Sequence, residues 1–330
     1  MEQTQLIGLL AGRQEYLSGE EMSRRLGVSR AAVWKELSAM RAAGWPIASS
    51  TRRGYRLEGE PPVLSAPYLE ALLGEHSLWS GRIHTFSSLD STNTRLKAMA
   101  AQGAAEGTVV LAEEQTAGRG TQGRTFHSPR GAGLYLSVLL RPQLPLAQLL
   151  PLTGWAAVAV GQGIGAACGL NPEIKWLNDL YLNGRKVCGI LTELSLVGES
   201  GEPDYVVLGV GVNLGQSRQQ FAAQGLENIA TSLALEGAQV SRHGAAAAIL
   251  TALEEMYRRF PQDGPAQLEA YRARCLTLGR QVQWEQGGVG YTGTARAVTE
   301  DFALEIATAS GQVHTVSAGT VSLLPGEVGV

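Results

Sequence analysis

Residues 175–191 read KWLNDLYLNGRKVCGIL, and this stretch decides how the centre of the 330-residue chain folds. Apolar and polar residues alternate on both sides of Asn183-Gly184, and Asn-Gly favours a two-residue type I′ hairpin turn. The stretch therefore predicts a β-hairpin. A lysine, an aromatic residue and an aspartate also lie close to the two cations Arg185-Lys186, so the hairpin is a candidate anion site. The two interpretations are compatible, and Asn178-Asp179 can equally be a simple turn.

Strand-like and helix-like runs alternate around this hairpin. The mixture predicts an α/β or α+β sheet domain. The strand-like runs are 108–115, 134–140, 180–194 and 204–214, and the helix-like runs are 90–102, 149–169 and 242–260.

The composition is that of a globular protein. Hydrophobic residues make up 44% and charged residues 17%, which is enough to bury a core and excludes wholesale disorder. The net charge of −3 excludes a protein coated in basic charge. The net charge is +2 over residues 1–60 and −5 over the remainder. The negative total therefore still allows a local nucleic-acid surface in the first sixty residues.

An uncharged stretch, residues 142–172, resembles both a membrane span and a dinucleotide-binding motif. A membrane span needs about 20 predominantly apolar residues, and this stretch is interrupted by Pro151, Gln162 and several glycines. Gly161, Gly163 and Ala166 fit the dinucleotide pattern G-x-G-x-x-A, but no turn signal and no suitably placed acid accompany them. We predict a buried core helix whose glycines allow close packing.

The loop Gln115–Arg124, QTAGRGTQGR, follows the first strand-like run. Its three glycines let backbone N–H groups approach an anion, and its two arginines can bind carboxylate or phosphate in bidentate fashion. The loop is not a Walker phosphate-binding loop, because it lacks G-x-x-x-x-G-K-[ST]. A solvated turn and an RNA contact are the alternatives.

A polar cluster, Ser91-Thr92-Asn93, precedes a helix-like run. Its hydroxyl and amide groups can hydrogen-bond a neutral polar ligand head such as a ureido group. The alternative is an ordinary helix N-cap.

The first sixty residues predict a winged helix-turn-helix. Ser18 and Glu21 suggest a capping box on one helix, and Ser29 can cap a second helix that ends at Gly44. Two short strands then flank a turn over residues 51–54. This order predicts DNA binding, with a small helical interaction domain as the alternative. The candidate DNA contacts are Ser29, Arg30, Lys35, Arg52 and Arg53.

Domain boundaries follow from these segments. The proline-containing stretch 59–67 predicts a linker. We assign the DNA-binding domain to residues 1–60, the linker to 61–68, a central domain to 69–262 and a C-terminal β domain to 275–326. Three scattered cysteines fit neither a disulfide framework nor a metal site, which predicts a cytoplasmic protein. We expect no signal peptide and no membrane association.

In this order, the segments resemble the family of bifunctional biotin–protein ligases and biotin operon repressors over nearly the whole chain. The resemblance rests on SGEEMSRRLGVSRAAVWKEL, SSLDSTN, AGRGTQGRTFHSP, the 175–191 stretch and GVGVNL. It implies an α+β fold with an N-terminal winged helix-turn-helix. A central mixed α/β ligase domain similar to class II synthetases and a C-terminal SH3-like β-barrel would follow.

The resemblance also implies residue roles. Lys186 and Arg119 would be catalytic. The biotin-binding residues would be Ser91, Thr92, Asn93, Gln115, Arg119, Gly120, Thr121 and Lys186. The ATP and adenylate residues would be Gly118, Arg119, Gly120, Arg124, Phe126, Lys175, Trp176, Asn178, Asp179 and Asn213.

The implied activity has two steps. Biotin and ATP with Mg²⁺ are the substrates for biotinyl-5′-adenylate, and the biotin is then transferred to a lysine of a biotin carboxyl carrier protein. No tightly bound cofactor and no protein metal site are expected. The adenylate would favour a homodimer that binds operator DNA. A ligand-sensing regulator without ligase activity, a lipoate or octanoyl transferase and an RNA-binding protein are the rival hypotheses.

The chain departs from the family pattern at four places. Thr121 replaces an arginine, Phe126 replaces a tryptophan, Leu177 replaces a proline and Asp301-Phe302 stands where a glycine-containing turn is common. Loss of the arginine predicts weaker retention of the adenylate while leaving its formation intact.

Overall fold

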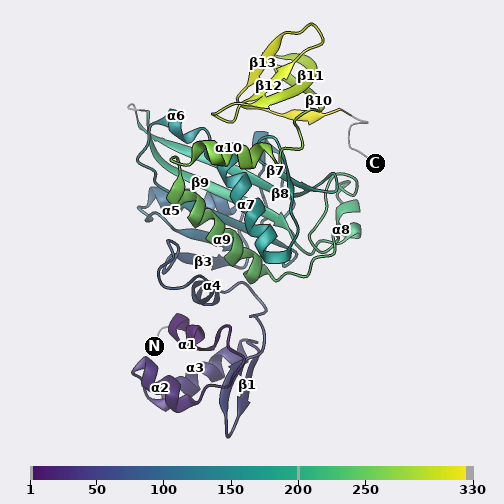
Figure 1. Cartoon of the computed structure of the whole chain (residues 1–330). Helices are drawn as coiled ribbons and strands as arrows, with labels where there is room; N and C mark the ends of the chain where they lie inside the picture. The colour runs from purple at the N-terminus through teal and green to yellow at the C-terminus, as the bar shows by residue number, and fades with distance from the viewer. Residues whose placement is uncertain (1–2, 199–200, 325–330) are drawn as a thin grey trace.

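The computed structural model describes residues 3–198 and 201–324. Three parts follow one another from the bottom to the top of Figure 1: an N-terminal helical domain, a central sheet domain and a C-terminal β domain. The α+β fold class is confirmed. The outer limits assigned to the first and last domains, residues 1–2 and 325–326, lie outside the described residues, as do residues 199–200 of the central domain.

The N-terminal domain has the predicted order of helix, turn, helix and hairpin. Ser18 and Ser29 cap the second and third helices by accepting hydrogen bonds from the N–H groups of Glu21 and Ala32. The capping box is only half formed, because the Glu21 carboxylate pairs with arginines of its own helix instead of the Ser18 N–H. The elements are α1 (Gln3–Leu10), α2 (Gly19–Leu26), α3 (Arg30–Ala42), β1 (Ile47–Ser50) and β2 (Gly54–Leu57).

The central sheet has seven strands in the order β3-β4-β5-β9-β8-β7-β6. The pair β3–β4 is parallel and the other neighbours are antiparallel. Asn183 and Gly184 both have positive φ, 48° and 73°, so the predicted type I′ hairpin forms between β7 and β8. The strands are β3 (Ile83–Phe86), β4 (Val109–Ala112), β5 (Gly133–Leu140), β6 (Glu173–Lys175), β7 (Asp179–Leu182), β8 (Arg185–Val197) and β9 (Glu202–Asn213).

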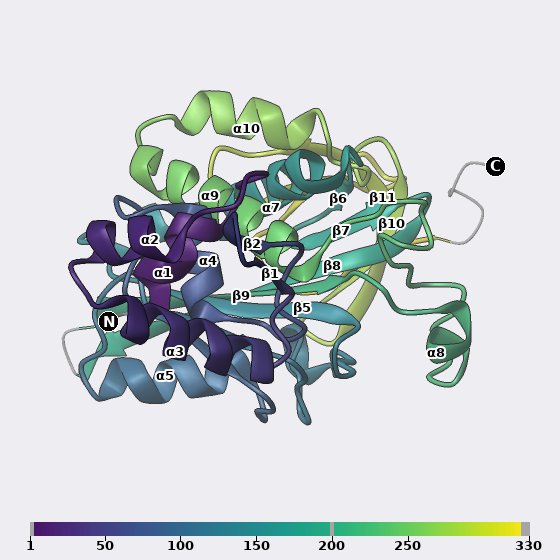
Figure 2. The ribbon, with the colours of Figure 1, turned by 90° about the horizontal axis from the view of Figure 1, so that it is seen from below.

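Helices cover both faces of this sheet (Figure 2). Alternate residues of β4 point to opposite sides: Val109 and Leu111 join the core under α7 and α9, and Val110 joins the smaller core under α5. The helices are α4 (Ala66–Leu73), α5 (Thr92–Ala101), α6 (Leu146–Leu149), α7 (Leu152–Cys168), α8 (Arg218–Ala222), α9 (Arg242–Arg259) and α10 (Gly264–Arg272), with a 3₁₀ turn at Thr121–Gly123.

Helix α7 is the predicted core helix. It runs without a break through Gly161 and Gly163, so the dinucleotide turn is absent. A Cβ at Gly163 would lie 2.7 Å from the Cα of Ile249 in α9, which explains why a glycine is needed there. The span Leu146–Cys168 is long and apolar enough to cross a membrane, but 67% of its most apolar window is buried inside the protein.

The segment assigned to the linker is tied to the central domain. Helix α4 begins within it, at Ala66. The N–H of Leu64 donates to Glu113 (2.6 Å), and the N–H of Ser65 donates to Nε2 of the buried His243 (3.0 Å). The Tyr68 ring lies edge-on to Trp45 of the N-terminal domain and to His243 of α9. The segment is therefore a packed joint between two domains.

The C-terminal domain is a five-stranded antiparallel sheet with the order β13-β12-β11-β10-β14. Phe302 anchors it to the central domain: its ring lies edge-on to Tyr271 at 5.0 Å, and its carbonyl accepts a hydrogen bond from Trp176 Nε1 (2.8 Å). Phe302 has φ of 64°, so the family's usual glycine conformation is kept by a bulky residue. The strands are β10 (Gln281–Gln286), β11 (Val289–Val298), β12 (Leu304–Ala307), β13 (Val313–Val316) and β14 (Val321–Leu323).

The contact between Gly154 and Phe302 gives a stability test. A Cβ at Gly154 would lie 2.1 Å from the Phe302 ring, so Gly154→Ala is expected to destabilise the protein by about 1–3 kcal/mol through overpacking. Gly161→Ala in the same helix is the matched control, because its nearest atom lies 3.6 Å away. That change should be neutral or stabilise by up to about 1 kcal/mol. Urea unfolding measures both, and equal stabilities would contradict the packing assignment.

Candidate functional site

A cavity of about 40 Å³ lies on the α5 side of the sheet, where α5 begins and β8 and β9 run side by side. The predicted site residues that it brings together come from three separate segments of the chain. They are Ser91, Thr92, Asn93, Gln115, Arg119, Gly120, Thr121, Phe126, Asn178, Asp179 and Lys186.

Glycines form the floor of this cavity. A Cβ at Gly209 would lie 2.2 Å from Asn93 Oδ1, and a Cβ at Gly211 would lie 2.6 Å from the ring of Phe126. Gly189 on the neighbouring strand faces the same space. The side chains above the sheet can therefore sit directly on its backbone.

A hydrogen-bond network holds the polar end. Gln115 Oε1 accepts from the N–H of Thr92 (2.8 Å) and from its hydroxyl (3.1 Å), and Gln115 Nε2 donates to Ser128 Oγ (2.9 Å). Thr92 and Asn93 are buried. Ser91 caps α5 by accepting from the N–H of Thr94, which confirms the helix-cap interpretation, and the cluster also lines the cavity.

Four residues of this network were not predicted: Ser128, Ser137, Glu193 and Lys97. Ser137 Oγ donates to Asn93 Oδ1 (2.6 Å), and Asn93 Nδ2 donates to Glu193 (2.8 Å), which pairs with Lys97 (2.5 Å). Burial alone would raise the pKa of Glu193, but the hydrogen bonds from Lys97 and Asn93 outweigh it and lower that pKa. Ser137 did leave a signal, as the one polar residue in the apolar run 134–140.

The glycine–arginine loop forms a small flap over the cavity. Gly120 N–H donates to Arg124 O (2.7 Å) and Phe126 N–H donates to Gly118 O (2.9 Å), so the loop folds back on itself. The Phe126 ring then rests on Gly211. Ligand pockets usually measure about 300–1,000 Å³. With the Phe126 ring in place the cavity, at about 40 Å³, is far smaller than that.

Lys186 supplies the cation at the cavity wall. The β7–β8 register shifts between Leu180 and Tyr181, and this bulge turns Lys186 toward the same space as Gly189. Its Nζ lies 2.7 Å from Asp179 Oδ1. Simple strand alternation would have put Lys186 and Gly189 on opposite faces.

Lys175 lies beside this pair. Burial lowers the pKa of Lys175; Asp179 opposes that shift, and Lys186 and Arg124 add to it. Its Nζ lies 5.7 Å from the centre of the Tyr181 ring. Lys175 is thus held close to the cationic wall without lining the cavity.

Four more of the predicted nucleotide residues lie outside the cavity lining. Trp176 is buried between the central and C-terminal domains, where its backbone N–H donates to Thr277 Oγ1 (3.0 Å). Asn213 stands two residues beyond Gly211 on the same face of β9 and donates to Thr231 O (3.0 Å). Gly118 and Arg124 belong to the flap itself.

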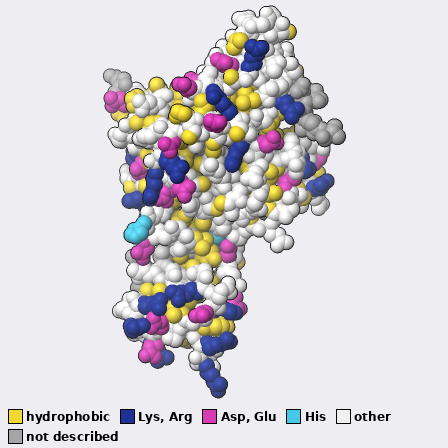
Figure 3. All heavy atoms as spheres, viewed as in Figure 1, with side chains coloured by type: hydrophobic (Ala, Val, Ile, Leu, Met, Phe, Trp, Pro, Cys, Tyr) yellow, Lys and Arg dark blue, Asp and Glu magenta, His cyan; other side chains and the backbone are white. Residues whose placement is uncertain are grey.

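Two of the five predicted DNA contacts line a common groove on the N-terminal domain. The Ser29 hydroxyl caps α3 by accepting from the N–H of Ala32. Arg30 and Arg52 line a groove between α3 and the β1–β2 hairpin. Trp34, 62% exposed on α3, lines the same groove and was not predicted. Figure 3 shows Lys and Arg side chains at this lower end of the molecule. Lys35 and Arg53 are also exposed, and the Arg53 guanidinium stacks on Tyr16.

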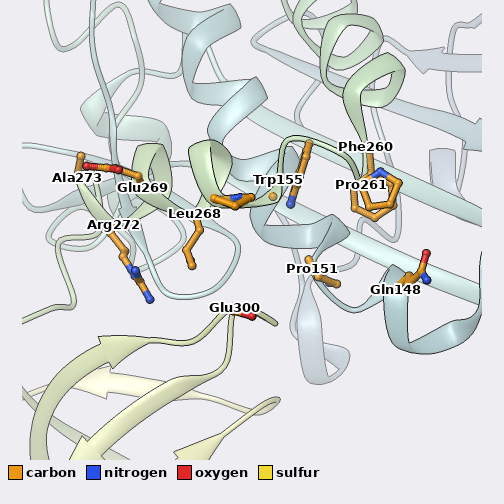
Figure 4. Close-up of a pocket in the computed structure, with 12 residues that line it drawn as sticks. Gln148, Pro151, Trp155, Phe260, Pro261, Leu268, Glu269, Arg272, Ala273 and Glu300 are labelled. Carbon is orange, nitrogen blue, oxygen red and sulfur yellow. The ribbon is translucent and has the colours of Figure 1, made fainter.

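A wider cavity of about 990 Å³ opens elsewhere, between α7, α10 and the C-terminal domain (Figure 4). Trp155, Phe260 and Leu268 form apolar walls, and Glu300 approaches from the C-terminal domain. It lacks the predicted site residues. The smaller cavity is therefore the candidate site, because the polar network and the Lys186 cation both line it.

Comparisons with known proteins agree with this architecture. Residues 85–213 match the biotin/lipoate A/B protein ligase family, and residues 2–56 match a helix-turn-helix domain. The chain is 35% identical to the bifunctional ligase/repressor BirA of Bacillus spizizenii, over 90% of this chain and 91% of that protein. It is 30% identical to the Escherichia coli protein of the same name, over 98% and 97%.

Solved structures extend the likeness to three dimensions. A biotin protein ligase from Aquifex aeolicus in complex with biotin and ATP superimposes with a TM-score of 0.61 at 26% identity, covering 74% of this chain and 99% of that one. At these identities and coverages, the chain belongs to the biotin/lipoate A/B protein ligase family, among the bifunctional ligase/repressors that carry a helix-turn-helix domain.

Proposed function

We propose that the cavity over Gly189, Gly209 and Gly211 binds biotin, and that the protein is a biotin–protein ligase and a DNA-binding repressor. The observation that carries this proposal is the joint arrangement of a neutral polar network, a side-chain-free floor and a cation around one small space. A ureido ring needs hydrogen-bond donors and acceptors, and the amide and hydroxyl groups of Thr92, Asn93 and Gln115 supply both.

The first step joins two anions. A carboxylate oxygen of biotin attacks the α-phosphorus of ATP, the new O–P bond forms, and the bond to pyrophosphate breaks. Lys186 and Arg119 lower the repulsion between the reacting groups and offset the charge that builds up on the phosphorus oxygens. Lys186 is already positioned by Asp179.

Magnesium would enter with the phosphates of ATP. Among the described residues no three His, Cys, Asp or Glu side chains cluster as a metal site.

The second step needs no nucleophile from this chain. A lysine amine of the carrier protein attacks the carbonyl carbon of the mixed anhydride, an amide forms and AMP leaves, with the amine proton passing to solvent. Cys188 is buried, and burial raises the pKa of its thiol, so it is a core residue. The flap closes over the adenylate and keeps water from hydrolysing it.

The acceptor protein and a second copy of the chain would both use the edge of the central sheet. Strand β7 pairs with β8 only up to Gly189, so within the described part of the chain residues 192–196 of β8 have a strand neighbour on one side only, β9. Such an edge favours pairing with another strand. A symmetric homodimer would present two copies of α3 and the hairpin to a palindromic operator. The protein would work in the cytoplasm, where its three cysteines stay free thiols.

Replacing the central cation tests the ligase activity. Lys186→Ala is expected to abolish biotin-dependent exchange of pyrophosphate into ATP, because the two anions then meet without Nζ between them. Lys35→Ala, on the distant N-terminal domain, should keep wild-type exchange. Exchange by the Lys186 variant at the wild-type rate would refute its role. Lipoate offered in place of biotin should give no exchange, and exchange with lipoate alone would favour the transferase hypothesis.

The corepressor role predicts a ligand-dependent affinity for operator DNA. If the adenylate favours the dimer, adding biotin and ATP should tighten binding at a fixed protein concentration, by roughly 5–150-fold. A fluorescence-anisotropy titration with and without both substrates measures this. Equal affinities would remove the corepressor role and leave a ligase with an independent DNA-binding domain.

The hairpin tip is predicted to contact DNA phosphates. Arg52→Ala should weaken binding to all sequences and reduce the slope of log affinity against log salt by about 1, because one fewer counterion is released. Arg259→Ala, exposed at the end of α9, is the matched loss of one positive charge and should leave the slope unchanged. If the two variants behave alike, the tip does not lie at the DNA backbone.

A further inference from the structure

The tip of the flap touches the C-terminal domain. Thr320, in the turn between β13 and β14, donates its hydroxyl proton to Gln122 Oε1 (2.5 Å) and accepts a hydrogen bond from Arg124 Nη2 (3.0 Å). These contacts join residues almost 200 positions apart. The neighbouring Gly319 has φ of 113°, a backbone conformation that favours glycine.

The chemistry of this contact requires a hydroxyl. One group must give a proton to an amide oxygen and accept one from a guanidinium at the same time, and among the small side chains only serine and threonine do both. The bond from the arginine is charge-assisted, which makes it stronger than a neutral bond of the same length.

The contact with Thr320 helps to offset the entropy cost of closing the flap. Gly118, Gly120 and Gly123 give this loop many open conformations, so closing it costs conformational entropy. Thr121 is uncharged, so between residues 118 and 124 the flap offers an adenylate only the cations Arg119 and Arg124. A fixed contact at the tip offsets part of that entropy loss by limiting how far the flap can open.

The C-terminal domain is itself a firm support. The Phe302 carbonyl accepts from Trp176, and the Phe302 ring packs against Gly154 and Tyr271 of the central domain. The flap is thus held between two parts of the molecule that are anchored to each other.

We propose that Thr320 is a positioning residue that holds the flap closed and slows the release of the adenylate. The inference rests on the proposed ligase function. It predicts that retention of the intermediate depends on the hydroxyl of Thr320, while formation of the adenylate at saturating biotin and ATP does not, since Lys186 and Arg119 supply the chemistry.

The test compares Thr320→Val with Thr320→Ser in the full-length protein. Labelled biotinyl-adenylate is formed on the enzyme, chased with unlabelled biotin, and its release is followed. The valine variant should release it roughly three- to tenfold faster, the loss expected for one or two hydrogen bonds, while pyrophosphate exchange stays within about twofold of wild type. The serine variant keeps the hydroxyl and should restore slow release. Thr315→Val, on β13 of the same domain, should match wild type.

A second variant separates the contact from general loosening of the domain. Gln122→Leu should speed release as well. Because both changes remove the same contact, the double variant Gln122→Leu/Thr320→Val should release the adenylate no faster than Thr320→Val alone. Fully additive effects, unchanged release by the valine variant, or equal release by the valine and serine variants would each overturn the proposal. A wild-type protein without biotin-dependent exchange would instead refute the proposed function, so the two failures are distinguishable.

Discussion

The site depends on one constraint: three glycines on β8 and β9 leave the sheet surface bare, so side chains from α5 and the flap can sit on the backbone itself. Asn93 and Phe126 occupy that space with no ligand bound. Any side chain at Gly209 or Gly211 would push them away. The bare backbone that accommodates the Phe126 ring would also accommodate a flat ligand in the proposed biotin site.

Both neighbouring domains are fastened close to this constraint. The carboxylate of Glu113, at the end of the strand that leads into the flap, accepts from Leu64 in the joint to the N-terminal domain and pairs with Arg242. On the opposite side, Thr320 holds the flap tip. The joint to the N-terminal domain and the C-terminal domain therefore both contact the stretch of chain that runs from the end of β4 through the flap.

The two faces of the central sheet differ: one is packed with apolar side chains, and the other carries the candidate site. Its α7 and α9 face is a continuous apolar core, and close packing at Gly163 shows how tightly those helices approach. Its α5 face carries a small apolar core first and then, toward the end of β9, the glycines and Asn213. Polar groups gather there, where the flap covers that part of the sheet in place of a helix.

The amino-acid sequence by itself determined the local features: the type I′ turn at Asn183-Gly184, the helix-turn-helix with its caps, the core helix through Gly161 and the composition of the flap. Each depends on neighbours a few residues away, which is the range over which backbone preference and periodicity act. Only the tertiary structure decided which groups meet. A bulge turned Lys186 toward Gly189, Trp176 is buried between two domains, and Glu193 and Thr320 make contacts around the site that no local pattern marks. Those outcomes depend on strand register and on burial between distant segments, and short-range patterns do not encode either one.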